Sequence, residues 1–346
     1  MPEDVPTAGA AEAVDTLVSI ALGYCQAQVL SAAAALGIAD LLADGPRSVD
    51  DLATATGTHA PSLYRFLRAL ASIGVVAADG EHRFHLTPLG DPLRSDAPDS
   101  VRDAIRLFGD PLLFEPWGQL LYSVRTGQPA FDHLHGVPLY DYLAHHPDAA
   151  AVFHAGMAAT PILHEVAAAY DFTQARTVVD VGGGDGTLLA SILRAHPALH
   201  GILFDTPQVA AGARERLERE GLAERCQVVG GTFFESVPAG GDLYLLSDIV
   251  HNWNDERAIT LLAHCRQAMA GGGQLLLIQR VLPSGDEPSR STFADLNGMV
   301  LLGGRERTAE EHQAVLAAAG FTLTRIIPIS PSYSIVEAVP VLDSER

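Results

Sequence analysis

The chain has 346 residues, of which 48% are hydrophobic and 18% are charged, and its formal net charge is −20. This length and composition predict a soluble globular protein of two or three domains. The acidic balance argues against a duplex nucleic-acid partner, because proteins that bind duplexes present a basic face to the phosphates.

The three cysteines, Cys25, Cys226 and Cys265, lie far apart and form no C-x-x-C pattern. This spacing excludes a disulfide framework and favours a reducing compartment. The N-terminus lacks the basic-then-apolar order of a signal peptide. The alanine-rich run over residues 19–42 is interrupted by polar residues, and we expect it to be too polar to span a bilayer. The sequence therefore predicts a cytoplasmic protein that does not enter a membrane.

The N-terminal region begins with residues 1 to about 10, which we expect to be disordered because they offer little to bury. Residues 11–36 are predicted to form one helix with apolar positions around most of its surface. A helix of this kind at a chain end often packs against a second subunit, so we expect a homodimer. Ser48 is predicted to cap a short helix over residues 49–55, and Ser62 to open another.

A small hairpin is predicted next, from the runs 75–76 and 83–86. Two helices followed by a hairpin are typical of a winged helix, which we place within residues 1–98. A DNA-binding regulator is the first alternative, because the second helix carries Arg65 and Arg68. The surroundings are acidic, however, and the same module commonly serves in dimerisation, which we favour here.

Residues 99–172 are predicted to be mostly helical, and they are rich in aromatic side chains. Some of these side chains are expected in the core. Others are expected in a wall that holds a flat aromatic substrate over the following domain.

From residue 173 to residue 346, short apolar runs alternate with helical patterns. This alternation predicts a doubly wound, Rossmann-like α/β domain with a mainly parallel sheet of seven strands. The expected strands are 178–181, 201–204, 226–229, 243–247, 274–278, 323–328 and 334–338. The clearest helices are expected at 209–220, 257–269 and 309–319.

A glycine-rich turn follows the first of these strands, which ends near Asp180. Gly182, Gly184 and Gly186 give the spacing G-x-G-x-G, without the lysine of a phosphate-binding loop. Asp205 ends the next strand, close to the place where nucleotide-binding folds put a ribose-binding acid. Acidic groups at the turn suit a ligand with a cationic end, such as S-adenosylmethionine. A structural turn without a ligand is the alternative.

His251 directly follows the strand 243–247, with Trp253 beside it. Since ligands bind at the carboxyl ends of parallel strands, this position favours a functional histidine over a structural one. Glu306 lies in Gly303-Gly-Arg-Glu-Arg-Thr308, on a loop that could reach the same edge of the sheet. A carboxylate bonded to one ring nitrogen would select the tautomer of a general base.

This pair suits methyl transfer to oxygen. A phenol has a pKa of about 10, so it needs a base at neutral pH, and a histidine near 6.5 can take its proton. Metal chemistry is not expected, because His133, His135 and the pair His145-His146 lack the context of a metal site. A serine hydrolase is excluded by the lack of a G-x-S-x-G elbow.

These motifs together resemble the S-adenosylmethionine-dependent O-methyltransferases of the plant caffeate type and their actinobacterial relatives in antibiotic biosynthesis. The resemblance extends over nearly the whole chain. It rests on six features: the N-terminal module, V-D-V-G-G-G-x-G, F-D-x-P at 204–207, G-x-F-F at 231–234, H-x-W-x-D at 251–255 and G-G-x-E-R-T at 303–308.

The resemblance implies roles for single residues. In the cofactor site it implies Asp180, Gly182, Gly184, Asp205, Thr232, Phe233, Ser247 and Trp253. His251 would be the catalytic base and Glu306 would hold it. The acceptor, a small aromatic molecule, would meet Phe153, Met157, Asn252 and Asn297. The product of the cofactor would be S-adenosylhomocysteine.

Three positions depart from the family pattern. Thr232 and Asn252 stand where aspartate is usual, and Gln279 stands where many members have glutamate. Two carboxylates near the histidine would thus be neutral amides, so Glu306 would have to supply more of the stabilisation of the imidazolium. Relatives of this fold have become hydroxylases, decarboxylases or pericyclases while keeping the cofactor, and such an enzyme is the alternative function.

Overall fold

The computed structural model describes residues 9–159, 162–269, 273–285, 287–289 and 291–341. The chain divides into two compact units, residues 1–114 with 151–159 and residues 115–150 with 160–346. The stretch predicted to be disordered lies almost entirely outside the described residues. The three-domain division drawn from the sequence stays a prediction.

The first unit begins with two helices where the sequence predicted one. Helix α1 covers Ala10–Ala21 and α2 covers Gly23–Leu36. The break falls at Leu22, whose carbonyl accepts from the Cys25 N–H at 2.9 Å. Gly23 is a weak helix former, which explains why the helix is interrupted at this point.

Three further helices build the core of this unit: α3 (Ile38–Leu41), α4 (Val49–Thr56) and α5 (Ala60–Ser72). The predicted cap is present, because the Ser48 hydroxyl accepts from the Asp51 N–H at 3.1 Å. Helix α5 begins two residues before Ser62, the predicted start, since Pro61 fits the first turn of a helix. Leu67 on α5 is fully buried in this core.

The hairpin of the predicted winged helix is present as β2 (Val76–Ala78) and β3 (Arg83–Leu86). A third strand, β1 (Arg47–Ser48), pairs with β3 on its other side. The sequence analysis missed β1 because two residues are too few to show an alternating pattern. The short helix η1 (Asp91–Leu93) and α6 (Arg102–Gly109) follow, and α6 packs along α2.

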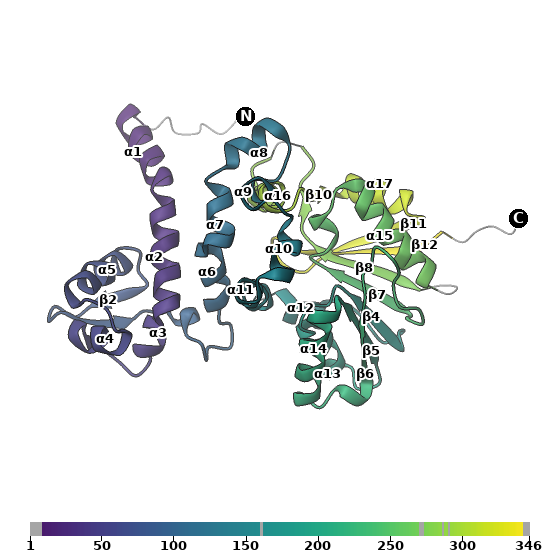
Figure 1. Cartoon of the computed structure of the whole chain (residues 1–346), viewed down its shortest axis with the longest axis horizontal. Coiled ribbons are helices and arrows are strands. Elements are labelled where there is room, and N and C mark those ends of the chain that lie inside the picture. Colours follow the sequence, from purple (N-terminus) through teal and green to yellow (C-terminus); the bar gives the residue numbers. More distant parts are fainter. Residues whose placement is uncertain (1–8, 160–161, 270–272, 286, 290, 342–346) are drawn as a thin grey trace, which may run out of the picture. The chain divides into compact units, whose positions relative to one another are not determined.

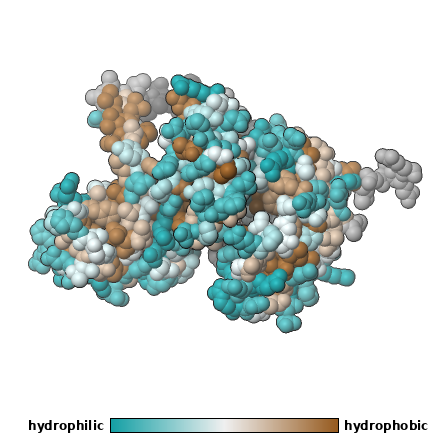
Figure 2. Space-filling model, in the orientation of Figure 1, coloured by the Kyte–Doolittle hydropathy of each residue, from teal (hydrophilic) through white to brown (hydrophobic). Residues whose placement is uncertain are grey.

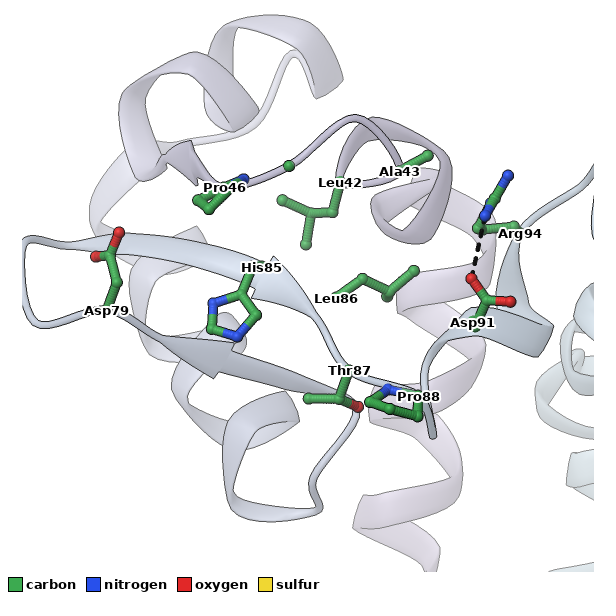
Figure 3. Close-up of a pocket in the computed structure, with 11 residues that line it drawn as sticks. Leu42, Ala43, Pro46, Asp79, His85, Leu86, Thr87, Pro88, Asp91 and Arg94 are labelled. Carbon is green, nitrogen blue, oxygen red and sulfur yellow. Dashed lines mark hydrogen bonds and ion pairs between the residues drawn. The ribbon is translucent and has the colours of Figure 1, made fainter.

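A surface hollow of about 840 Å³ lies beside this small sheet (Figure 3). Leu42, Leu86 and Pro88 form part of its lining, together with Asp91 and Arg94. The arginine is bonded to Asp91 at 3.1 Å and also pairs with Asp96. The hollow therefore lacks the row of free cations that a phosphate backbone would need.

Helix α1 exposes its apolar side chains. Leu17 is 67% exposed and Ile20 is 70% exposed, and Figure 2 shows this hydrophobic surface in brown at the upper left. A large exposed apolar patch marks a surface that is covered in the functional state. By length and composition alone the helical stretch Glu12–Leu36 could cross a membrane. The expectation that residues 19–42 do not span a bilayer stays a prediction.

The middle of the chain is helical, as predicted. It contains α7 (Pro111–Trp117), α8 (Leu120–Thr126), α9 (Ala130–His135), α10 (Leu139–His145), α11 (Pro147–Ala158) and α12 (Ile162–Ala169). Glycines in the left-handed conformation end α8 and α9.

The second unit is built on a seven-stranded sheet, in the order β11-β12-β8-β7-β4-β5-β6 (Figure 1). All seven predicted strands are present, with ends that differ by at most two residues. Their bounds are β4 Thr177–Val181, β5 His200–Asp205, β6 Cys226–Gly230, β7 Leu243–Ser247, β8 Gln274–Gln279, β11 Phe321–Pro328 and β12 Ser334–Pro340. Strands β4 to β8 are parallel, whereas β12 and β11 are antiparallel additions.

Helices cover both faces of this sheet and bury two apolar cores. One core includes residues of α15 (Asp255–Ala268) and α17 (Ala309–Ala318), and the other includes residues of α12, α13 (Thr187–Ala195) and α14 (Pro207–Arg219). Fully buried parallel strands of this kind explain the continuous apolar runs in the sequence. The carboxyl ends of β4, β5, β7 and β8 therefore meet at one edge.

We expect that charging the exposed face of α1 abolishes self-association. The double variant Leu17→Glu/Ile20→Glu places two carboxylates on the apolar surface, which would have to be desolvated in an interface. Light scattering coupled to size-exclusion chromatography should show a monomer for this variant. Ala55→Glu, an exposed position on α4, should keep the mass of the parent. A dimer that persists in the double variant would exclude α1 from the interface.

Candidate active site

His251 lies on the short helix η3 (Val250–Asn252), four residues after β7 ends. Its Nδ1 is 3.0 Å from Oε1 of Glu306, which precedes the short strand β10 (Arg307–Thr308). The side chain of Glu306 is 3% exposed and that of His251 is 18% exposed. The two residues that the sequence analysis paired thus meet at the expected edge of the sheet.

The surroundings of this pair favour its charged form. Burial alone lowers the pKa of His251, but the hydrogen bond and charge of Glu306, with the charge of Asp248, outweigh burial and raise that pKa above its ordinary value. Burial raises the pKa of Glu306, yet His251 and Arg280 reverse the effect and leave it below the usual range. Glu306 is therefore an anion that stabilises the imidazolium.

Three further residues surround the pair, and the sequence analysis missed all of them. Asp248 Oδ1 lies 3.8 Å from His251 Nδ1, and Asp248 Oδ2 accepts from the Tyr333 hydroxyl at 3.1 Å. Arg280, directly after β8, lies 3.6 Å from Glu306 and 3.9 Å from Asp248. Asp248 follows the β7 strand end, which is a usable signal, whereas nothing in the sequence places Tyr333 here.

The backbone at Asp248 has the left-handed φ of 53°. This conformation is uncommon for residues other than glycine, although aspartate and asparagine adopt it most readily. The Asn252 side chain stabilises the turn by donating to the Asp248 carbonyl at 2.9 Å. The turn directs the chain from β7 into η3 and so brings His251 back toward the sheet edge.

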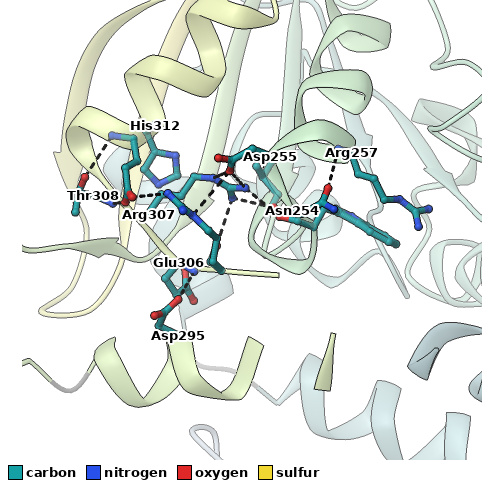
Figure 4. Close-up of polar contacts among 12 residues, drawn as sticks. Asn254, Asp255, Arg257, Asp295, Glu306, Arg307, Thr308 and His312 are labelled. Atoms are coloured by element: carbon teal, nitrogen blue, oxygen red, sulfur yellow. Dashed lines mark hydrogen bonds and ion pairs between the residues drawn. The ribbon is translucent and has the colours of Figure 1, made fainter. Parts of the chain in front are cut away.

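A strap formed by Gly303–Thr308 holds the histidine segment from the other side. A Cβ on Gly304 would lie 2.1 Å from the His251 carbonyl oxygen, so only glycine allows this approach. The buried Arg307 donates to the carbonyls of Val250 and Trp253 and pairs with Asp255 at 2.8 Å (Figure 4). One guanidinium therefore satisfies both ends of the segment that carries His251.

The strap is itself fixed at three further points. The Glu306 N–H donates to Asp295 on α16 (Ser291–Leu301) at 2.8 Å (Figure 4). Strand β10 pairs with β9 (Val281–Leu282), and Thr308 then forms a capping box with Glu311 at the start of α17. The carboxylate of Glu306 is thus positioned by backbone contacts on both sides.

The glycine turn after β4 has the geometry of a ligand-binding loop. Gly182 has a φ of 75°, and a Cβ there would lie 2.5 Å from the side chain of Ile249. The Gly184 N–H donates to Oδ2 of Asp205 at 2.9 Å, which ties the loop to the end of β5. Carboxylate oxygens accept more than one bond, so Asp205 keeps capacity for a hydroxyl.

Two buried polar groups beside this loop have no hydrogen-bond partner among the described residues. They are the carboxyl of Asp180 and the hydroxyl of Ser247, at the ends of the neighbouring strands β4 and β7. Burial first, then the charges of Asp205 and Asp185, raise the pKa of Asp180 to about 7. Buried polar groups are normally satisfied, so this place fits a ligand with donors and a positive charge.

Aromatic rings line the adjoining part of the edge. Trp253 lies 4.8 Å from Phe234 and 6.1 Å from Phe233, both edge-on, measured between ring centroids. Tyr140 on α10 lies 5.9 Å from Trp253 at a shallow angle. The Phe234 N–H donates to the Thr232 hydroxyl at 3.3 Å, which shapes the loop after β6. Flat rings of this kind suit an adenine base.

Within the described residues, the side chains of the two amides discussed for the base have no hydrogen bond to His251. Gln279 is buried with its amide nitrogen 3.2 Å from the ring nitrogens of His312, and Asn252 bonds the Asp248 carbonyl. The expectation that the Gln279 amide lies beside the base is therefore corrected, because this side chain lies beside His312. Side chains alternate along a strand, so Gln279 points to α17 while Arg280 faces the base. Burial and Arg307 lower the pKa of His312 to about 4, so it is neutral.

The remaining predicted residues lie in helices. The Asn297 side chain, on α16, accepts from Trp117 Nε1 at 2.9 Å, which leaves its amide hydrogens for other partners. Phe153 and Met157 lie on α11, within the first unit. The roles assigned to all these cofactor and acceptor residues stay predictions. Among the described residues there is no group of three or more His, Cys, Asp or Glu that could hold a metal ion.

The sequence was compared with known families. Residues 18–96 match the O-methyltransferase dimerisation domain, and residues 117–322 match the O-methyltransferase domain. The chain belongs to the O-methyltransferase family. Residues 18–96 therefore form a dimerisation module, and this range includes the C-terminal end of α1 with the exposed Ile20.

Relatives of this chain act in natural-product pathways. It is 45% identical to the phenazine O-methyltransferase PhzM of Lysobacter antibioticus, over 96% of this chain and 98% of the relative. It is 39% identical to the 8-amino-8-demethylriboflavin N,N-dimethyltransferase of Streptomyces davaonensis, over 89% of this chain and 90% of the relative. The family thus includes methylation of oxygen and of nitrogen.

Solved structures support the same assignment. The crystal structure of LaPhzM matches with a TM-score of 0.90 and covers 94% of this chain and 99% of its own. The neocarzinostatin enzyme NcsB1, solved with S-adenosylmethionine and a hydroxynaphthoic acid, is 35% identical with a TM-score of 0.78, over 91% of this chain and 96% of its own. The present enzyme is an S-adenosylmethionine-dependent methyltransferase. Its predicted cytoplasmic location stays a prediction.

We expect Gly304→Ala to impair both folding and turnover, because the added methyl group would overlap the His251 carbonyl. Overpacking of this kind costs about 1–3 kcal/mol. Urea unfolding should show that loss, and kcat should fall because His251 is displaced from Glu306. Gly212→Ala, at a helical position with open space, is the matched control and should be neutral or slightly stabilising. Equal stability and activity of both variants would contradict the strap.

Proposed function

We propose that this enzyme methylates a hydroxyl group of an aromatic natural product, with His251 as the general base. The observation that carries the proposal is the 3.0 Å bond between His251 Nδ1 and the buried Glu306. This bond fixes the proton on Nδ1 and leaves Nε2 as the acceptor atom. The structure gives Nε2 no hydrogen-bond partner within the residues it describes, so it is available to a substrate.

S-adenosylmethionine, when bound, supplies a methyl group on a positively charged sulfur. The protein must then hold an acceptor oxygen in line and remove its proton. His251 takes the phenol proton at Nε2, and Glu306 stabilises the imidazolium that results. General base catalysis of this kind contributes typically about 10²–10⁴-fold, and correct alignment contributes at least as much.

The residues around the glycine loop support a donor site beside this base. Asp180 and Ser247 present buried polar atoms without a described partner, and Asp205 ends β5 on the same edge. A carboxylate at Asp205 would bind the ribose hydroxyls, and the acidic pair Asp180 and Asp205 would favour a cationic donor. Thr232, Phe233 and Trp253 would surround the adenine.

Natural-product relatives support the acceptor class. The phenazine, naphthoate and aminohydroxybenzoate substrates in the names of relatives are all flat and aromatic. The aromatic helices α8 to α10 offer rings to such an acceptor. Asn297, Phe153 and Met157 would contact it, as the resemblance implies.

Nitrogen methylation is the second candidate, favoured by the relatives that are named N-methyltransferases. A neutral arylamine attacks without losing a proton first. It therefore has less need of a base held by a buried carboxylate, and the His251–Glu306 pair favours oxygen. The non-methylating enzyme that the sequence analysis gave as an alternative is not favoured, because the chain belongs to a methyltransferase family.

We expect His251→Asn to lower kcat by about 10²–10⁴-fold with a phenolic acceptor, since the proton acceptor is lost. The affinity for S-adenosylmethionine, measured by calorimetry, should stay within about twofold. A panel of phenols and arylamines, followed by mass spectrometry and S-adenosylhomocysteine release, separates the three candidates. Full turnover of phenols by His251→Asn would refute the base. Cofactor binding without release across the panel would favour the non-methylating alternative.

We expect Asp205→Asn to weaken the binding of S-adenosylmethionine by about tenfold or more, because hydrogen bonds to a charged group contribute about 1.5–3 kcal/mol. Calorimetry measures this directly. Asp242→Asn is the matched control, since Asp242 also accepts from backbone N–H groups, those of Arg176 and Thr177, at the start of β4. Equal donor affinity in the Asp205 variant and the parent would exclude the ribose role.

A further inference from the structure

The proposed mechanism needs one carboxylate beside His251, but the structure places two there. Two carboxylates approach His251 Nδ1, Glu306 at 3.0 Å and Asp248 at 3.8 Å. A general base must be neutral before it accepts a proton. Two nearby carboxylates instead raise the pKa of His251, because each stabilises the imidazolium even when no acceptor is bound.

Arg280 is placed to offset this effect. Its Nη1 lies 3.6 Å from Glu306 Oε1 and 3.9 Å from Asp248 Oδ1, the same two oxygens that face the histidine. The guanidinium lies over the ring of Tyr333, 4.3 Å from its centroid. Tyr333 in turn donates to the other oxygen of Asp248 at 3.1 Å. Arg280 is thus held between the two carboxylates by a ring that also anchors one of them.

We propose that Arg280 is a positioning residue that, held by Tyr333 between Asp248 and Glu306, limits how strongly these two carboxylates favour protonation of His251 in the resting enzyme. This inference rests on the proposed role of His251 as the base. The cation competes with the imidazolium for the two carboxylates, so a smaller fraction of His251 is protonated before the acceptor arrives than without Arg280. Glu306 still selects its tautomer, and Asp248 supplies the second stabilising charge once the proton has moved.

The other groups packed around this cluster do not supply the same effect. Asp295 contacts the cluster through the Glu306 N–H. Burial raises the pKa of Asp295 and also that of Asp248, but at Asp248 the charges of His251 and Arg280 act against burial. Burial raises the pKa of the Tyr333 phenol, which stays neutral. His312, behind Glu306, is neutral as well. Asp248, Glu306 and Arg280 are therefore the charges that face His251.

The test compares Arg280→Gln with the parent over a range of pH. Without the cation, His251 holds its proton to a higher pH, so the acid limb of kcat/KM moves to higher pH. We expect kcat/KM at pH 6.5 to fall about tenfold, which corresponds to one pH unit, while at pH 9 it stays within about twofold. Arg280→Lys keeps the charge and should restore most of the activity at pH 6.5.

Nuclear magnetic resonance of the labelled histidines measures the protonation of His251 directly, in the absence of an acceptor. The His251 signal is assigned as the one missing from His251→Asn, and its titration midpoint should rise in Arg280→Gln. Asp248→Asn removes a carboxylate but keeps a residue that tolerates the left-handed backbone, so it should lower the midpoint. Arg219→Gln, an exposed charge loss on α14, should leave the midpoint unchanged.

These measurements separate the possible failures. An unchanged His251 midpoint in Arg280→Gln would overturn the inference, even if activity were lost at every pH, because Arg280 would then be structural only. An unchanged His251 midpoint in Asp248→Asn would show that Asp248 does not contribute to the protonation of His251. If instead the midpoint rises while His251→Asn retains full turnover, the electrostatic inference holds and the base assignment fails.

Discussion

One buried arginine holds the reactive segment in place. Arg307 is 1% exposed, and it bonds the carbonyls at both ends of the segment Val250–Trp253 as well as the carboxylate of Asp255. Hydrogen bonds from a charged group, such as those to the carbonyls of Val250 and Trp253, contribute about 1.5–3 kcal/mol each. The geometry of His251 therefore depends on a side chain that does not touch it.

The same strap couples the base to its partner. Gly304 lies against the His251 carbonyl, and Glu306 follows two residues later with its side chain on the imidazole. A movement of this strap would change the contact at the backbone and the hydrogen bond at the side chain together. The pair behaves as one unit with the strap, and its distance is set by backbone packing rather than by two flexible side chains.

Much of this arrangement could be predicted from the sequence. Apolar β-branched runs identified the strands of the sheet, and the strand-end rule placed Asp180, Asp205 and His251 at one edge. Glu306 was predicted through its motif. Asp248 and Arg280 each directly follow a strand, yet a sequence does not say which face of a strand end a side chain takes. Gln279 was placed near the base through the family pattern, although its side chain faces His312. Tyr333 joins the site only through the antiparallel addition of β12.

Because strands β4 to β8 are parallel, their carboxyl ends lie at one edge of the sheet and their amino ends lie at the opposite edge. Asp180, Asp205 and Ser247 lie at carboxyl ends and His251 follows one, whereas the opposite ends carry structural contacts, such as the bonds from Arg225 to the carbonyls of Leu193 and Leu199. Substitutions that raise the thermal stability of this enzyme are therefore best placed at the edge opposite the site. Substitutions in the turns that precede the strands can tighten the scaffold without touching turnover, so robustness and catalytic speed need not be traded against each other.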